Sequence, residues 1–141
     1  MDELTRYLKL GDYDKSKLEQ ILNTKIIITD DHIKHIKFDY YNYNPELNII
    51  KLFEQYGYIF TNDIYILLIN KNGYMLKYMS TDNITNEICK IAVQQTGNAL
   101  EYVPENKKTN ELCVIAIRQH MDTLEYVPAN KKIAVVIYSM F

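Results

Sequence analysis

The sequence predicts an all-α fold, a short right-handed helical-repeat solenoid with two short helices in each 24-residue unit and a non-repeat helical N-terminal cap. Two observations favour it. The pentapeptide LEYVP occurs at 100–104 and again at 124–128, and aligning residues 85–108 with 109–132 leaves 15 of 24 positions identical. Within each copy the apolar residues follow the i, i+3, i+4 spacing of one buried helix face. A β-solenoid is not favoured, because apolar positions do not alternate and the chain has only four glycines.

The repeat divides the chain into two predicted parts. Residues 1–43 show no repeat, and we expect them to form the helical N-terminal cap. Residues 44–141 form the predicted helical-repeat domain. Its units are a partial copy at 44–60 that starts at Asn44, a diverged copy at 61–84, two close copies at 85–108 and 109–132, and a partial copy at 133–141. Because so small a unit cannot bury its own apolar face, neighbouring units must stack to share a core.

The N-terminal part carries signals for three short helices. Residues 1–8 and 16–22 have helical apolar spacing. Thr29 is a candidate cap for a third helix, which carries Ile33 and Ile36 on one side.

Each close copy begins with a helix capped by threonine. Thr85 precedes a first turn that carries Glu87, a carboxylate that the helix dipole favours there. The predicted buried face comprises the same positions in both copies: Ile88, Ile91, Ala92, Leu112, Ile115 and Ala116.

A glycine follows the first helix and a proline ends the second. Gly97 is expected to close the first helix in the left-handed conformation, as are Gly73 and Gly57. The second helix, at 98–103, stops at Pro104 because proline cannot continue a helix. Met121 occupies the position of this glycine in the last full copy, so its helix end must differ.

The segment 133–141 begins another unit and is almost entirely apolar. In register, Ile137 would take the buried cysteine position and Met140 the buried alanine position. Tyr138 and Phe141 belong to the same apolar segment. We expect it either to fold back over the last repeat or to be covered by another molecule, because such a patch marks an interaction site.

These residues carry a family resemblance. The pattern N-E-[IL]-C-x-x-A-[VI]-x-Q, followed by the signature A-L-x-Y-V-P, resembles the repeat of a domain-of-unknown-function family abundant in giant DNA viruses of the mimivirus kind. The match is specific over 85–132, weaker over 61–84 and absent before about residue 44. The resemblance implies a giant-virus origin and a helical-repeat structure. It brings no known catalytic residue or ligand.

Composition and charge exclude several classes of protein. The formal net charge of −2 gives no general attraction to nucleic acid or anionic membrane. The longest apolar run is too short to cross a bilayer, and the polar N-terminus is not a signal peptide. Two cysteines outside any C-x-x-C pair suit a reducing compartment. We expect a protein that is not secreted and that works in the host cytoplasm (the viral factory) or in the virion.

The sequence offers little catalytic or metal-binding chemistry. His32 and His35 lie near two aspartates, but a two-histidine set lacks the further ligands of a zinc site. Cys89 and Cys113 hold equivalent positions beside buried residues, with no activating partner nearby, so we expect them to pack in the core. No phosphate-binding glycine loop or nucleophile elbow is present. We therefore expect a protein that is not an enzyme, with no catalytic residue, cofactor or metal.

Tyr78, Tyr102 and Tyr126 occupy one position in three successive copies. They form either a stacking platform for bases or peptide side chains, or a repeated packing contact. A small basic edge adjoins them, and glutamates are interleaved with it. That edge comprises Lys107, Lys108, Lys131 and Lys132.

The expected function is a non-enzymatic protein-interaction or structural module that binds a viral or host protein. Gln94 and Arg118 mark a position that varies between copies and lines the predicted binding face. The alternative is an RNA-associated repeat protein that uses the tyrosines and the lysine edge, although nucleic acid is the less favoured partner. A homodimer through the C-terminal apolar segment is a second partner hypothesis.

Overall fold

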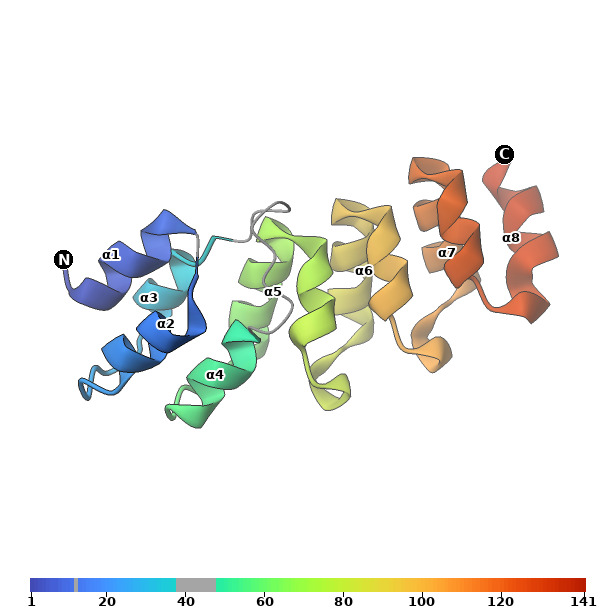
Figure 1. Ribbon diagram of the computed structural model, residues 1–141. Coiled ribbons are helices and arrows are strands. Elements are labelled where there is room, and N and C mark those ends of the chain that lie inside the picture. The colour runs from blue at the N-terminus through green and yellow to red at the C-terminus, as the bar shows by residue number, and fades with distance from the viewer. Residues whose placement is uncertain (12, 38–47) are drawn as a thin grey trace. The chain divides into compact units, whose positions relative to one another are not determined.

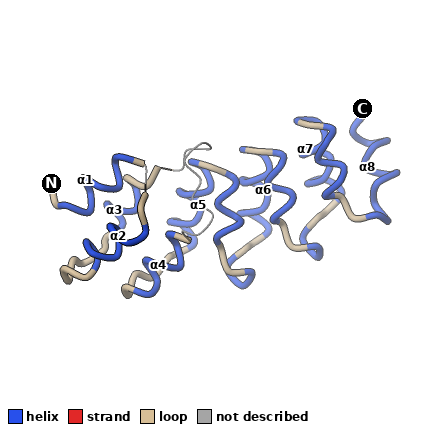
Figure 2. The backbone as a smooth tube through the Cα atoms, viewed as in Figure 1, coloured by secondary structure: helices blue, strands red, loops and turns tan. Residues whose placement is uncertain are grey.

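The computed structural model of the protein describes residues 1–11, 13–37 and 48–141 (Figure 1). Every regular element among these residues is a helix, and the part of the chain that the structure describes contains no strand (Figure 2). The prediction of an all-α fold is confirmed. None of the helices formed by these residues is both long and apolar enough to span a membrane.

The chain divides into two compact units, Met1–Leu67 and Leu68–Phe141. The boundary predicted after residue 43, and the start of the first partial copy at Asn44, lie outside the described residues. The domain limits 1–43 and 44–141 therefore stay a prediction.

The first unit is built from short helices that begin at polar caps. The side chains of Asp2, Asp14 and Asn48 each accept a backbone N–H from the first turn of the helix that follows. The elements are α1 (Glu3–Leu10), α2 (Lys15–Leu22), α3 (Asp30–Lys34), α4 (Ile49–Gln55) and the start of α5 (Asn62–Lys71). The three helices predicted before residue 37 are confirmed. These helices and the residues directly after α3 supply fully buried side chains: Leu4, Leu8, Leu18, Ile21, Ile33 and Ile36.

His32 connects α3 to the start of α1. Its Nδ1 accepts the backbone N–H of Thr29 at 3.0 Å and lies 2.8 Å from the Thr29 hydroxyl. Because Nδ1 accepts a hydrogen bond from a backbone N–H, the ring N–H is at Nε2. This nitrogen lies 3.1 Å from the Asp2 carboxylate. Both ring nitrogens of this buried histidine are thus engaged in holding the unit together.

The second unit repeats one series of elements at a step of 24 residues (Figure 2). Each copy contains an α-helix, a six-residue 3₁₀ helix and a three-residue 3₁₀ turn. After the end of α5, the elements are η1 (Gly73–Tyr78), η2 (Thr81–Asn83), α6 (Asn86–Gln95), η3 (Gly97–Tyr102), η4 (Glu105–Lys107), α7 (Asn110–Gln119), η5 (Met121–Tyr126), η6 (Ala129–Lys131) and α8 (Lys132–Ser139).

The second helix of each copy is a 3₁₀ helix followed by a separate 3₁₀ turn. The expectation of two helices per unit therefore missed one short element. Between the extended residue Thr96 and Pro104 there is room for only a few helical residues, and 3₁₀ bonding suits such short pieces.

The buried face of α6 is rotated relative to the predicted one. Ile88 and Ala92 are buried as expected, but Cys89 and Val93 complete the face and Ile91 is only half-buried. The same four positions are buried in α7: Leu112, Cys113, Ala116 and Ile117. The helix is thus covered from two sides, by 3₁₀ helices and by the neighbouring α-helix, which shifts its buried face.

Two of the glycines that follow the α-helices, Gly73 and Gly97, serve close packing between copies. Gly57 has the predicted left-handed conformation, with φ of 85°. For Gly73 and Gly97 this prediction is wrong, because neither has positive φ. A β-carbon on Gly73 would collide with the carbonyl oxygen of Ala92, and one on Gly97 would lie 3.0 Å from that of Ala116. Each glycine thus lets the next α-helix approach the backbone.

The last helix, α8, leaves the 24-residue register. Where threonines cap α6 and α7, the chain has Ile133, which cannot accept an N–H. The helix begins instead at Lys132, directly after η6, and buries Val135 against its neighbours. The predicted buried positions of Ile137 and Met140 are wrong, because these side chains are 50% and 76% exposed.

Replacing Gly73 by alanine is expected to destabilise the second unit by about 1–3 kcal/mol, since the new methyl group overpacks a backbone contact. Urea unfolding followed by circular dichroism measures the change. Met121→Ala is the matched control, because this equivalent position already accommodates a large exposed side chain. A Gly73→Ala protein as stable as the wild type would contradict the close-packing role of this glycine.

The first unit is expected to lose stability as the pH falls from about 4 to about 2. Chiefly the backbone N–H of Thr5, and also His32, lower the pKa of Asp2 to about 2. A lowered pKa in the folded state stabilises the fold above the unfolded value near 4, and acid removes that contribution. Thermal melting of wild type and Asp2→Asn across this pH range measures the difference. An identical pH dependence in both proteins would contradict the assignment.

Candidate functional site

The predicted row of tyrosines lies along the 3₁₀ helices of the second unit. We call Tyr78, Tyr102 and Tyr126 the tyrosine row: each is the last residue of η1, η3 or η5, and each is half-buried. Successive 3₁₀ helices pack against each other, η1 on η3 and η3 on η5. The repeat therefore places equivalent rings on neighbouring elements.

Tyr102, in the middle of the row, has two neighbours from the preceding copy. The ring of Tyr74 meets it edge-on, with centroids 6.3 Å apart and an interplanar angle of 74°. The ammonium group of Lys77 lies 5.9 Å from the centroid of the Tyr102 ring, within the range of a cation–π interaction. Tyr74 was missed by sequence reasoning, because Asn98 occupies its equivalent position in the next copy.

Glutamates flank the row in the two close copies. Burial, followed by the carboxylate of Glu101, raises the pKa of the Tyr102 hydroxyl. A hydrogen bond with Glu125 is the main cause that raises the pKa of Tyr126. Burial raises the pKa of Tyr78. The three hydroxyls therefore stay protonated at neutral pH. Exposed carboxylates adjoin the last two rings, and the ammonium of Lys77 also lies near Tyr102.

The four lysines predicted to form a basic edge are placed differently from one another. Lys108 is only 6% exposed. Its ammonium donates to the Tyr126 carbonyl at 2.9 Å and to Glu105 at 3.0 Å. Lys131 donates to the Lys108 carbonyl at 2.6 Å, and Lys107 and Lys132 are half-buried. Lys108 therefore joins two copies in the interior and does not belong to an exposed edge.

Gln119 is a residue whose role sequence reasoning missed. Its Nε2 donates to the carbonyls of Val93 at 2.7 Å and Gln94 at 3.2 Å, at the end of α6. Its Oε1 accepts the backbone N–H of Gly97 at 2.7 Å, at the start of η3. One amide thus satisfies polar groups at a helix end and at a helix start in the preceding copy. The only signal for this role in the sequence is that the preceding copy also carries a glutamine, Gln95, at the equivalent position.

Gln94 and Arg118 are both exposed, as expected for a position that varies between copies. Arg118 also donates through Nη2 to the Tyr138 carbonyl at 3.3 Å, near the end of α8, where a positive charge favours the helix dipole. Tyr138 and Phe141 are exposed, Phe141 at 94%. The C-terminal segment thus packs on α7 with one side and leaves apolar side chains uncovered on the other.

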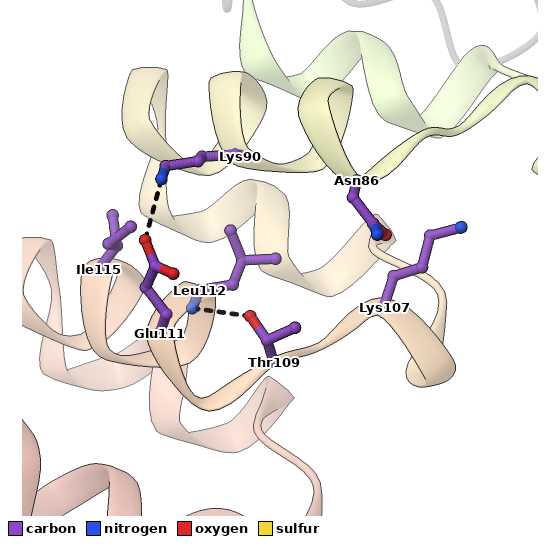
Figure 3. Close-up of a pocket in the computed structure, with 7 residues that line it drawn as sticks. All are labelled: Asn86, Lys90, Lys107, Thr109, Glu111, Leu112 and Ile115. Atoms are coloured by element: carbon purple, nitrogen blue, oxygen red, sulfur yellow. Dashed lines mark hydrogen bonds and ion pairs between the residues drawn. The ribbon is translucent and has the colours of Figure 1, made fainter.

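A shallow depression of about 160 Å³ lies between the exposed sides of α6 and α7 (Figure 3). The ammonium of Lys90 and the carboxylate of Glu111 face each other across it at 2.9 Å. Thr109, at its rim, accepts the backbone N–H of Leu112 and so caps α7. The Lys90–Glu111 ion pair links α6 to α7, and Thr109 caps α7. The residues that line this depression include no nucleophile–base pair.

The histidines and cysteines considered as metal ligands or nucleophiles have structural places in the fold. His35 lies 3.9 Å from Asp31, one helical turn away. Within residues 1–11, 13–37 and 48–141, no group of three or more histidine, cysteine or acidic side chains is arranged to hold a metal ion. Cys89 and Cys113 are unpaired and buried, and burial raises the pKa of both thiols. Their predicted packing in the core is confirmed.

Comparison with protein families gave one match in the repeat region. The sequence model of a family described as "Domain of unknown function (DUF4116)" matches residues 62–107 and, one repeat later, residues 86–131. Residues 62–131 are therefore similar to this family in sequence. No curated protein and no solved structure matched the chain.

Proposed function

We propose that the chain is a non-enzymatic interaction module, a small right-handed α-solenoid that binds a protein partner through side chains differing between its copies. The burial pattern carries this proposal. The positions of Ile88, Cys89, Ala92 and Val93 are buried again 24 residues later. Exposed positions do not follow the same rule: Lys90 becomes the half-buried Val114, and Gln94 becomes Arg118. Repeat proteins commonly present such variable side chains on a rigid repeated core.

The remaining parts of the proposal concern capping and origin. We assign the N-terminal helical segment as the cap that covers the first open repeat face. The motif resemblance to giant-virus repeats favours a viral protein that acts in the host cytoplasm or in the virion, with a viral or host protein as its partner. In this proposal the sequence similarity to a domain of unknown function supports the repeat unit and no particular activity.

An RNA-associated function is the alternative, and the charges near the tyrosine row speak against it. Exposed Glu101 and Glu125 adjoin two of the three rings, and a carboxylate repels a phosphate backbone. Lys108, which the RNA hypothesis would use, is buried with its own partners.

Exchange of residues between equivalent positions tests the proposed function. Lys90→Val with Gln94→Arg installs residues that the next copy already carries, so the fold should be retained. We expect this variant to lose most of the crosslinked partner that wild type captures from infected host cells, identified by mass spectrometry. Glu87→Asp is the control, because it installs the residue that the preceding copy carries at this position. We expect this variant to capture the partner as the wild type does. Unchanged capture, or capture abolished by ribonuclease, would overturn the proposal.

Self-association through the C-terminal segment is the second partner proposal. Ile133, Ile137, Met140 and Phe141 are exposed at a spacing of i, i+4, i+7 and i+8, which places them along one side of the segment. We expect light scattering to give the mass of a dimer at high concentration, and Ile133→Glu to shift it to that of a monomer. Ile59→Glu, at a similarly exposed isoleucine in the first unit, should leave the mass unchanged. A monomeric wild type at every concentration would remove this proposal.

A further inference from the structure

The ring of His32 joins the starts of two helices in the first unit. Its Nδ1 accepts the backbone N–H of Thr29, the residue that precedes α3, at 3.0 Å. Its Nε2 lies 3.1 Å from the carboxylate of Asp2, which caps α1. The histidine is only 7% exposed. Imidazole commonly changes its charge between about pH 5 and 8, so a proton on this ring acts at both helix starts.

A second proton on the ring has opposite effects at its two nitrogens. At Nδ1 the acceptor becomes an N–H, which cannot accept the N–H of Thr29. The Thr29 hydroxyl, 2.8 Å from Nδ1, can accept the new N–H instead. At Nε2 the donor stays in place, and the imidazolium is attracted more strongly to the carboxylate of Asp2. Protonation therefore releases the backbone of Thr29 but keeps the ring at the start of α1.

Asp2 supplies the charge that contacts this ring within the described part of the first unit. The pKa of Asp2 is lowered to about 2, chiefly by the backbone N–H of Thr5, so its carboxylate is ionised throughout that pH range. The other charged residues in the first turn of α1 and on α3 are exposed or pair with another side chain. These residues are Glu3, Arg6, Asp30, Asp31, Lys34 and His35.

The segment that Thr29 anchors contains a residue in an unfavourable backbone conformation. Lys25 has φ of 60°, in the left-handed region that residues other than glycine seldom adopt. Such a conformation persists only where its surroundings hold it in place. On one side of Lys25, Thr24 bonds the Ile21 carbonyl through both its backbone N–H and its hydroxyl. On the other side the anchor is the bond from Thr29 to His32, and its loss allows Lys25 to relax.

We infer that His32 makes the conformation of residues 25–29 respond to pH. The neutral ring holds this segment at the start of α3, and the protonated ring releases it while Asp2 keeps the ring at α1. The segment carries Ile27, whose side chain is 82% exposed, so acid loosens an apolar part of the surface. This regulation concerns the first unit alone and does not depend on the proposed interaction function.

Two-dimensional NMR of the intact chain between pH 5 and pH 8 tests this inference. We expect the ring protons of His32 and the amide proton of Thr29 to titrate with one midpoint. The protection of the Thr29 amide against exchange, corrected for the intrinsic rate at each pH, should fall by roughly tenfold as the ring becomes charged, because one hydrogen bond is lost. Relaxation of the backbone nitrogens should show greater motion at 25–28, while the amides of α1 keep their protection.

His32→Gln is the matched variant, because a glutamine at this position of a capping box accepts the same N–H and does not titrate. The Thr29 amide of this variant should show no such change between pH 5 and pH 8. His35→Gln removes the neighbouring histidine and should leave the Thr29 titration as in the wild type. Circular dichroism checks that both variants keep their helix content.

Measurements on the wild type alone can contradict the inference. It fails if the His32 ring does not titrate between pH 5 and pH 8, or if the Thr29 amide does not follow the ring. A Thr29 titration that persists in His32→Gln, or that disappears in His35→Gln, would also overturn it. Loss of protection along α1 at the same midpoint would show that Asp2 does not retain the charged ring.

Discussion

The second unit depends on how closely the backbone of one copy approaches that of the next. Gly73 and Gly97 face the carbonyl oxygens of Ala92 and Ala116; a β-carbon would collide at Gly73 and would make a tight contact, at 3.0 Å, at Gly97. The amide of Gln119 then bonds both the end of α6 and the start of η3. Because hydrogen bonds and close packing act at the same contact, each copy fixes the position of its neighbour.

This arrangement explains why the interior and the surface follow different rules. A side chain at the copy-to-copy contact meets backbone atoms, which cannot move aside easily, so the same small residues recur there. The outer positions of α6 and α7 are less tightly packed, and they accept the exposed Lys90 in one copy and the half-buried Val114 in the next. Residues on such a surface can change without altering the core.

Features that depend on local sequence were predictable, and features that depend on distant partners were not. The helices, their threonine caps and the packed cysteines follow from spacing and composition alone. Gly97 misled the prediction, because glycine signals either positive φ or a close approach, and only the position of Ala116 decides between them. Lys108 looked exposed because its partner, the Tyr126 carbonyl, lies 18 residues further on. The row of tyrosines was predicted, but the ring of Tyr74 beside it was not.

Neighbouring copies with nearly identical sequences can pair wrongly with one another. Two segments that share 15 of 24 residues can exchange partners during folding, or continue end to end into another molecule. Met121 removes that ambiguity, because it stands where Gly73 and Gly97 admit the next backbone. A further copy would meet a methionine side chain where the two earlier copies have a glycine. The last full copy thus differs from the two before it at the residue that carries the copy-to-copy contact.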